Sequence, residues 1–373
     1  MLDADIKACK EGMKMATGSE AEKGESKWEV EVPEKKLKDK LYFENLKAVV
    51  IDTELCSRCL TCVSICPSGL IVTEDDRVGF PDYEERCLDC GACVRVCPRF
   101  IYEPLSGLGD YIEIVAARSK RFMGQDGAMA TEIIASAIDM GMIDQGLFVD
   151  RSEKWQTNIF HVRDPKQFGI GTLGGTKYVF AGVLPALKEA VRFTKKGVGV
   201  VGTPCMISGI RKLQEEFPVF REKVKLVVGL FCTENFHYED LMKFLREEKE
   251  IEIEKILKTD ISKGSMYITI EGKEKKRRVK MAEFEERGLV AKGCDFCTDF
   301  TAVQSDASVG SVGSEKGFST VIVRNENAKK VMEYIREKGT AEFSKEIVMD
   351  EIDYLINFKK KREEHIKELP QLE

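Results

Sequence analysis

The chain has 373 residues, enough for two or three domains of roughly 100–200 residues each. Hydrophobic residues make up 43% of it and charged residues 33%, a balance that excludes an intrinsically disordered chain. The formal net charge is −6, from 58 basic and 64 acidic residues. The average field therefore repels phosphate backbones, and we expect no nucleic-acid partner.

We expect neither a transmembrane segment nor a signal peptide. The longest stretch without a charged residue, 197–210, is too short to cross a bilayer and contains four glycines and a proline. The opening residues MLDADIKACKEG include acids and no apolar run, so they do not indicate export. We therefore expect a cytoplasmic protein, or one that is peripheral to a membrane complex.

Residues 1–47 are rich in Lys, Glu, Gly and Ser and show no sustained hydrophobic period. This composition predicts an N-terminal extension and not a domain. The extension would dock on a partner, and its lysines would favour an acidic face: Lys35, Lys36, Lys38 and Lys40. A simply disordered tail is the alternative. Cys9 lies in this segment and is given no role.

Two similar cysteine motifs occupy residues 48–104. Each has the spacing C-x2-C-x2-C-x3-C followed by proline: Cys56, Cys59, Cys62 and Cys66 before Pro67, then Cys87, Cys90, Cys93 and Cys97 before Pro98. The first three thiolates of such a motif hold one 4Fe-4S cluster, while the fourth ligates the other cluster. We therefore assign Cys56, Cys59, Cys62 and Cys97 to a first cluster, and Cys66, Cys87, Cys90 and Cys93 to a second cluster.

These motifs predict a bacterial-type two-cluster 4Fe-4S ferredoxin-like module over 48–104. The segment LIVTEDDRVGF between them has apolar flanks around an acidic turn, which indicates a β-hairpin. Zinc knuckles are the alternative, but they need two ligand pairs separated by a finger and give no reason for the crossed, proline-terminated repeat. Disulfides are not expected in a chain without a secretory signal.

Residues 105–373 alternate between strand and helix patterns, which predicts an α/β domain with a mostly parallel sheet. The first predicted helix lies within 126–143, with Asp126 as its N-cap and Gly141 as its stop. Helices are also predicted near 183–194, 207–217, 238–248, 327–338 and 350–368, strands at 198–203, 224–231 and 319–324, and a charged hairpin at 264–281. The tail KKKREEHIKEL is interpreted as a solvated helix face.

Four cysteines of this domain suggest a third four-thiolate site. Cys205 and Cys232 each follow a short apolar run that is typical of a strand in a buried parallel sheet. Their thiols would emerge at the carboxyl ends of the strands, where open α/β sheets bind ligands. Cys294 and Cys297 form a C-x2-C hook on a loop. The alternative for each strand-end cysteine is a small buried hydrophobic residue.

Glycine-rich loops are the candidates for binding a cofactor phosphate. A literal G-x-G-x-x-G at 197–202 lies inside a predicted strand and does not open a helix, so we do not interpret it as a dinucleotide motif. Two other loops could offer backbone N–H groups to a diphosphate: one with Gly174, Gly175, Thr176 and Lys177, and one with Gly310, Gly313, Ser314 and Gly317. Ordinary turn chemistry is the alternative for each loop.

Six runs of residues, in order, resemble one protein family. The runs QDGAMATEIIASAID, GGTKYVF, GTPCMISGIRKL, GLFCTENF, GCDFCTDF and GSVGSEKGFSTVI are similar to those of the family of beta subunits of coenzyme F420-reducing hydrogenase and F420-dependent formate dehydrogenase. The resemblance implies a flavin- and F420-binding domain with FAD and a 4Fe-4S cluster held by Cys205, Cys232, Cys294 and Cys297. Within the matched runs, further candidate cofactor-binding residues are Gly127, Tyr178, Thr203 and Asn235.

A two-cluster module joined to this domain resembles the electron-input subunit of F420 dehydrogenases. The resemblance implies that F420 is the substrate and that FAD exchanges a hydride with it. It also implies that three 4Fe-4S clusters carry single electrons to or from a partner redox complex. The partner would be a membrane F420 dehydrogenase core, a heterodisulfide reductase or a sulfite reductase. Lys177, the catalytic candidate, would stabilise negative charge on the reduced flavin or its diphosphate, and a surface lysine is the alternative.

The sequence alone leaves two alternative functions. One is a polyferredoxin-like relay subunit with three clusters and no flavin. The other is a flavin iron–sulfur subunit that uses NADH, against which the misplaced glycine motif counts.

Overall fold

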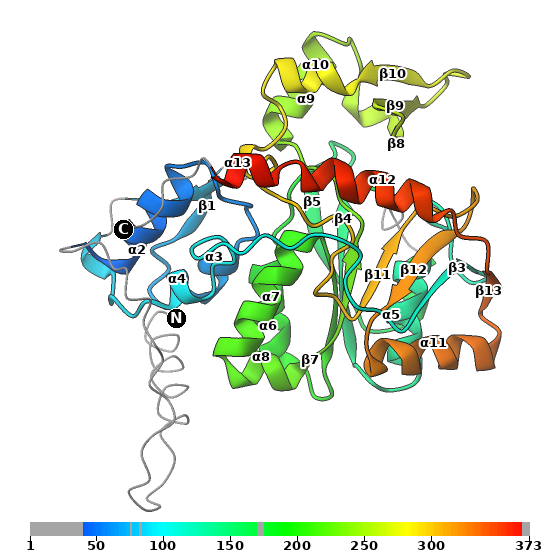
Figure 1. The fold of residues 1–373 in the computed structure, drawn as a ribbon, viewed down its shortest axis with the longest axis horizontal. Coiled ribbons are helices and arrows are strands. Elements are labelled where there is room, and N and C mark those ends of the chain that lie inside the picture. The colour runs from blue at the N-terminus through cyan, green and yellow to red at the C-terminus, as the bar shows by residue number, and fades with distance from the viewer. Residues whose placement is uncertain (1–39, 75–76, 82–83, 170–174, 368–373) are drawn as a thin grey trace, which may run out of the picture.

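The computed structural model describes residues 40–74, 77–81, 84–169 and 175–367. Its described part has three regions: a small N-terminal module, a large sheet with helices on both faces, and a small three-stranded lobe (Figure 1). Within these residues, no helix combines the length and apolar character needed to cross a membrane.

The N-terminal module consists of short helices and one hairpin. Its elements are α2 (Tyr42–Leu46), η1 (Lys47–Ile51), α3 (Thr61–Ile65), β1 (Val72–Glu74), β2 (Arg77–Gly79), η2 (Glu84–Arg86) and α4 (Ala92–Arg95). β1 and β2 pair antiparallel, so the predicted hairpin is confirmed. Phe43 and Leu46 of α2 pack in one hydrophobic cluster with Cys62 and Cys93. The part of the N-terminal extension that the structure describes therefore belongs to the core of this module.

The large sheet has eight strands in the order β13-β3-β12-β11-β7-β6-β4-β5. They are β3 (Glu113–Ser119), β4 (Gln145–Arg151), β5 (Thr157–Val162), β6 (Val198–Gly202), β7 (Val224–Leu230), β11 (Ala307–Gly310), β12 (Ser319–Val323) and β13 (Ala341–Ser344). The four adjacent strands β11, β7, β6 and β4 are parallel, whereas β5 on one side and β12, β3 and β13 on the other join through antiparallel pairs. The expected parallel sheet is thus the centre of a mixed sheet.

Helices cover both faces of this sheet (Figure 1). They are α5 (Met129–Asp139), η3 (Pro165–Gly169), α6 (Val183–Phe193), α7 (Pro204–Glu216), α8 (Pro218–Lys223) and α11 (Glu326–Lys338), whereas α12 (Met349–Lys360) and α13 (Glu363–Lys367) run across one end of the sheet (Figure 1). α6 and α7 pack on the face that carries Val200 and Val227, while α5 and α11 pack on the face that carries Val201 and Val228. Alternate residues of β6 and β7 thus point to opposite faces, and both faces are buried.

The small lobe lies between β7 and the cysteine hook in the sequence. It contains α9 (Tyr238–Glu247), η4 (Ile253–Lys255), β8 (Ile256–Ser262), β9 (Ser265–Ile270), β10 (Arg277–Lys280), α10 (Met281–Glu286) and η5 (Lys292–Cys294). The strands form an antiparallel sheet in the order β10-β9-β8, whose β9–β10 part is the predicted charged hairpin. Phe236, Leu245 and Phe284 fill the core between its helices and strands.

The start of α5 differs from its predicted position. Gly141, with φ +74°, follows the end of the helix as expected. Asp126 was predicted to be the N-cap, but the cap residue is Ala128, which has a left-handed conformation and makes no side-chain cap bond. Asp126 instead accepts hydrogen bonds from the Gly317 backbone N–H and the Ser311 hydroxyl. Tertiary contact with the second glycine loop therefore replaces the local cap.

Candidate functional site

The two cysteine loops of the N-terminal module have the same backbone shape. Arg58 and Asp89, each two residues after the first cysteine of a motif, have φ +57° and +45°. Leu60 and Gly91, each four residues after it, have φ +63° and +68°. The N–H groups of Arg58 and Asp89 each donate to the sulfur of the cysteine two residues earlier, at 3.4 Å. Because left-handed backbone is unfavourable for residues other than glycine, its repetition indicates that both loops are shaped around their sulfurs.

The pKa values of the cysteines show which thiols lie close together. Burial raises the pKa of Cys62 well above its usual range, and further increases come from Cys97, Cys59, Cys56 and Cys93. Burial also raises the pKa of Cys93 to about 12, and further increases come from Cys90, Cys66 and Cys87. The first three cysteines of each motif thus lie near the fourth cysteine of the other motif, as the crossed assignment requires.

The donor set fits iron–sulfur clusters better than single zinc ions. Within the described residues, no three His, Cys, Asp or Glu side chains are arranged as ligands of one metal ion. Each thiolate of a 4Fe-4S cluster binds a different iron, so its sulfurs stand further apart than those around one zinc. Beside Cys56, the buried Ser57 hydroxyl has no hydrogen-bond partner. A cluster sulfide is an acceptor that this hydroxyl could use.

The four remaining described cysteines also come together, at the carboxyl ends of the central strands. Cys205 lies in the first turn of α7, directly after β6, and Cys232 follows β7. Cys294 and Cys297 are joined by a hydrogen bond from the Cys297 N–H to the Cys294 carbonyl, at 3.0 Å. Burial raises the pKa of Cys232 well above its usual range, with added contributions from the other three thiols. We call Cys205, Cys232, Cys294 and Cys297 the third cysteine set.

The third cysteine set lies against the loop of the first motif. A Cβ atom on Gly293 would stand 2.0 Å from the Cys56 carbonyl oxygen, so only glycine permits this approach. On α7, a Cβ atom on Gly209 would stand 2.2 Å from the Thr61 Oγ1 and 3.6 Å from the Cys59 Sγ. Cys59 also contributes to the raised pKa of Cys205, after burial and Cys297. The module and the large sheet therefore meet where two cysteine sets face each other.

Buried cations surround the third cysteine set. Arg99, which is 4% exposed, donates to the Phe296 carbonyl at 3.0 Å and lies over the Tyr102 ring at 3.9 Å. Lys359 in the last turn of α12 is 1% exposed, and its Nζ lies 3.0 Å from the Cys297 Sγ. Although burial opposes ionisation, Lys359 and then Arg99 lower the pKa of Cys297.

The interpretation of the C-terminal tail as a solvated face is therefore wrong for its first residue, Lys359. It is also wrong for Arg362, which donates to the carbonyls of Thr233 and Cys294 at 2.9 and 2.8 Å and pairs with the Glu234 carboxylate at 3.1 Å. A run of charges is usually solvated, and no signal in the sequence alone shows that this run covers a cysteine site. Arg99, a single charged residue after the second cysteine motif, was also missed.

The two predicted glycine loops approach each other at residues 125–126, which follow β3. In the first loop, the Thr176 N–H donates to the Gln125 Oε1 at 3.4 Å. In the second loop, Gly317 and Ser311 donate hydrogen bonds to the Asp126 carboxylate. Burial raises the pKa of this carboxyl group, and the positive charge of Lys258 partly opposes the increase. The Lys258 Nζ donates to the Gln125 carbonyl at 3.1 Å, a cation that the sequence analysis did not single out. Gly174 lies outside the described residues.

Lys177 and Tyr178 are half-buried at the end of the first glycine loop. Burial lowers the pKa of Lys177 to about 8, with Asp150 raising it and Arg151 lowering it. The Tyr178 hydroxyl accepts a hydrogen bond from the Ile261 N–H at 3.0 Å, and burial raises the pKa of this hydroxyl.

The other cofactor candidates divide into two groups. Thr203 and Asn235 form the first group, which lies beside the third cysteine set. The Thr203 Oγ1 lies 3.3 Å from the Cys205 Sγ, and the Asn235 backbone makes a hydrogen bond to Cys294. The second group contains the remaining candidates, of which Gly127, Gly310 and Gly313 are positions where a side chain would clash with a neighbouring atom. A Cβ atom would stand 2.3 Å from the Ala117 carbonyl at Gly127, 2.0 Å from the Phe231 ring at Gly310 and 2.7 Å from Ile352 at Gly313. Gly175 and Gly317 have φ +88° and +89°, and Ser314 bonds the Phe318 carbonyl at 3.1 Å.

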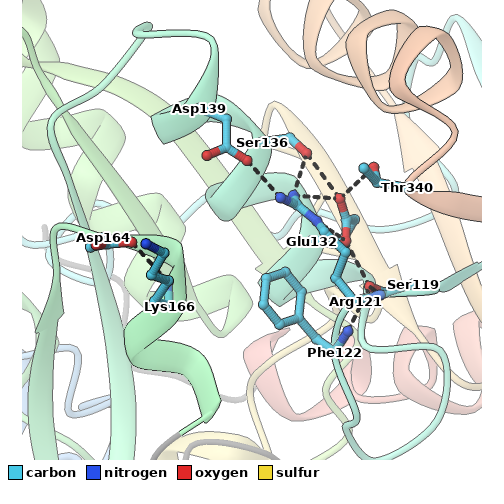
Figure 2. A network of polar contacts seen from close by, with 9 residues as sticks. All are labelled: Ser119, Arg121, Phe122, Glu132, Ser136, Asp139, Asp164, Lys166 and Thr340. Carbon is cyan, nitrogen blue, oxygen red and sulfur yellow. Dashed lines mark hydrogen bonds and ion pairs between the residues drawn. The ribbon is translucent and has the colours of Figure 1, made fainter.

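A buried carboxylate anchors the segment between β3 and α5 that carries Gln125 and Asp126 (Figure 2). Glu132, which is 0% exposed, accepts hydrogen bonds from Ser119, Arg121, Ser136 and Thr340 at 2.6–3.2 Å. The Arg121 guanidinium also bonds Asp139 at 2.6 Å. The network joins β3, α5 and the turn before β13.

Comparison with known protein families agrees with this division of the chain. Residues 48–98 match a 4Fe-4S dicluster domain. Residues 114–188 and 195–347 match the N-terminal and C-terminal models of the coenzyme F420 hydrogenase/dehydrogenase beta subunit. The chain belongs to this family of beta subunits.

Members of this family match over most of their length. The coenzyme F420 hydrogenase subunit beta of Methanothermobacter thermautotrophicus is 34% identical, over 63% of this chain and 85% of that protein. An F420H2 dehydrogenase subunit of Methanosarcina mazei is 28% identical, over 86% of this chain and 94% of that protein. A chain of the F420-reducing NiFe hydrogenase complex from Methanosarcina barkeri has a TM-score of 0.65 and 26% identity, over 72% of this chain and 95% of that chain.

Proposed function

We propose that the chain is a flavin iron–sulfur subunit that exchanges a hydride with coenzyme F420 through FAD and relays single electrons through three 4Fe-4S clusters to or from a partner redox complex. Membership of this family supports F420 as the substrate, since the related proteins are F420 hydrogenase and F420H2 dehydrogenase subunits. The dicluster match supports the electron relay. The observation that carries the proposal is the grouping of twelve cysteines into three sets, two of which face each other.

The family matches and the grouping of the cysteines support a division of the chain into three parts. We propose a two-cluster ferredoxin module over 48–104, a domain that binds FAD, F420 and the third cluster over 105–373, and a partner-docking extension over 1–47. Helix α2, at the end of the extension, packs on the module, and residues 1–39 lie outside the described residues. Related subunits of F420 complexes support a redox partner of the same kind.

Bound FAD would supply the change from two-electron to one-electron transfer, because a flavin can exchange both hydride and single electrons. We place its diphosphate where the two glycine loops meet at 125–126. There, left-handed glycines at 175 and 317 permit close backbone approach, and Lys258 is the nearby cation. The half-buried ammonium of Lys177 would stabilise negative charge on the flavin ring or diphosphate.

The positions of the three cysteine sets give an order of electron transfer. The third cysteine set, at the carboxyl ends of the strands, faces the predicted first cluster through Cys205 and Cys59. The predicted first cluster lies next to the second through Cys62 and Cys93. Leu88, beside Cys87 of the second cluster, is 53% exposed. We therefore propose that electrons pass from the flavin through the third, first and second clusters to the partner.

Iron analysis and one variant test this function. Anaerobically purified protein should contain about twelve iron atoms per chain, four for each four-thiolate site. A content near eight would refute a cluster in the third cysteine set. In Cys205→Ala, reduced F420 should still bleach the flavin while reduction of the partner or of an artificial acceptor collapses. Unchanged acceptor reduction would refute the relay order.

Released cofactors distinguish the other functions. Acid extraction should yield a flavin spectrum, and its absence would favour a relay subunit without flavin. Faster reduction of the flavin by NADH than by reduced F420 would favour the NADH-using alternative.

A further inference from the structure

The last turn of α12 brings an ammonium group to the third cysteine set. The Lys359 Nζ donates to the Cys297 Sγ at 3.0 Å, to the Cys232 carbonyl at 3.0 Å and to the Asp299 carbonyl at 2.8 Å. These three acceptors satisfy the three N–H groups of an ammonium. Two of the acceptors belong to proposed cluster ligands, one through its sulfur and one through its backbone.

A lysine at 1% exposure needs a negative partner, because burying an unpaired charge is costly. The two carbonyls are neutral and supply hydrogen bonds only. The Asp299 carboxylate is bonded instead to the Val303 N–H, at 3.1 and 3.3 Å. The neighbouring cation Arg362 has its own partner, the Glu234 carboxylate at 3.1 Å. The thiolate of Cys297 is therefore the charged group that Lys359 contacts directly.

We propose that Lys359 is the charge partner of the third cluster, and that its ammonium raises the reduction potential of this cluster. The inference rests on the proposed function, which places a cluster at the third cysteine set. A four-thiolate cluster is anionic and gains one further negative charge when it is reduced. A fixed positive charge in a buried site stabilises the more negative state more strongly, and a hydrogen bond to a cluster sulfur acts in the same direction.

Lys359 lies beyond the stretch that matches the family's C-terminal model, which ends at residue 347. The four cysteines of the set all lie within that stretch, whereas the cation comes from a separate helix, α12, that follows it in the chain (Figure 1). The charge on Lys359 can therefore set the potential of the cluster without any change in its ligands.

Potentiometric titration of the full chain, followed by electron paramagnetic resonance under anaerobic conditions, tests this role. The signal of the third cluster is identified as the one that Cys205→Ala removes. Lys359→Met and Lys359→Gln remove the charge, and Lys359→Arg keeps it. Lys360→Met is the matched control, because Lys360 is the exposed neighbour on the same helix. Iron content is measured for every variant.

We expect the two uncharged variants to retain about twelve iron atoms. Their third-cluster midpoint should fall by at least about 59 mV, which corresponds to a tenfold change in a one-electron equilibrium constant. The midpoints of the other two clusters should shift less, and Lys359→Arg and Lys360→Met should leave the third midpoint in place. Loss of the third cluster in both uncharged variants, with retention in Lys359→Arg, would also support a charge partner.

Three results would overturn the inference. An unchanged third midpoint in an uncharged variant that keeps its iron would exclude an effect of the charge. Loss of the cluster in all three Lys359 variants, Arg included, would assign the residue to packing alone. A wild-type protein without a signal that depends on Cys205 would overturn both the inference and the third cluster of the proposed function, and the wild type alone distinguishes this case.

Discussion

Because Gly293 packs against Cys56, the interface between the N-terminal module and the large sheet is sensitive to the addition of a single methyl group. In Gly293→Ala, the new Cβ would stand 2.0 Å from the Cys56 carbonyl oxygen and 2.6 Å from its carbonyl carbon. A carbon and an oxygen not joined by a bond approach to about 3.3 Å, so the backbones must separate by about 1.3 Å. Since the obstacle is backbone, no change of rotamer relieves it.

Overpacking of this kind costs about 1–3 kcal/mol. At about 1–2 °C per kcal/mol for a chain of this length, the melting temperature should fall by roughly 1–6 °C. Because Gly293 precedes Cys294, the separation should also slow electron transfer from flavin to acceptor. Differential scanning calorimetry and stopped-flow reduction measure the two effects. Gly182→Ala is the control, since it has φ −76° and open space around its Cβ position. If Gly293→Ala has the same melting temperature and the same rate of electron transfer as Gly182→Ala, the close contact between Gly293 and Cys56 does not determine how the module packs on the large sheet.

Two further residues give predictions that depend on charge. Glu132→Gln should lower the free energy of unfolding by about 1–3 kcal/mol, because Arg121 loses a fully buried charged partner but can turn toward water. Asp139→Asn removes the more exposed partner of Arg121 and should lower the same free energy by only about 0–1 kcal/mol. Equal losses for the two variants in denaturant titrations would contradict the difference in burial between Glu132 and Asp139. Lys177, with its pKa at about 8, should bind an anionic cofactor group well below that pH and weakly above it. Flavin-binding titrations across this range should lose their pH dependence in Lys177→Met. Without cofactor, the lowered pKa should make wild-type stability rise with pH between about 8 and 10.5, because the unfolded chain then holds more protons.

The sequence predicted the elements whose pattern is local. The hairpin between the cysteine motifs, the strands at β6, β7 and β12 and the helices α5, α6 and α11 all lie near their predicted ranges, because apolar period and glycine stops are visible in short windows. The antiparallel flanks were not predicted. β3 lies far from β12 and β13 in the chain, and the direction in which it pairs with them depends on connections that pass around the sheet.

The candidate site shows the same division between local and distant contacts. Cysteine spacing predicted ten of the twelve expected ligands, because a cluster demands fixed intervals along the chain, whereas Cys205 and Cys232 were predicted from the ends of their strands. Charged residues carry no such interval. Lys359 in a run of lysines and Arg99 after a cysteine motif look solvated in sequence, and only their packing against the third cysteine set reveals otherwise. The N-cap assigned to Asp126 was wrong for a related reason, since a distant loop competes for its carboxylate.

The order in which the third cysteine set is built along the chain has a consequence for biosynthesis. Its cysteines, the last of them Cys297, leave the ribosome before α12 does. A nascent chain thus displays the complete set of thiols while the side that α12 will cover is still open. Under the proposed function, iron and sulfide for the third cluster would enter from that side before Lys359 and Arg362 take their places beside Cys297 and Cys294. Chains that end before α12 would keep all four thiols of the third cysteine set but lack the two cations that pack beside them.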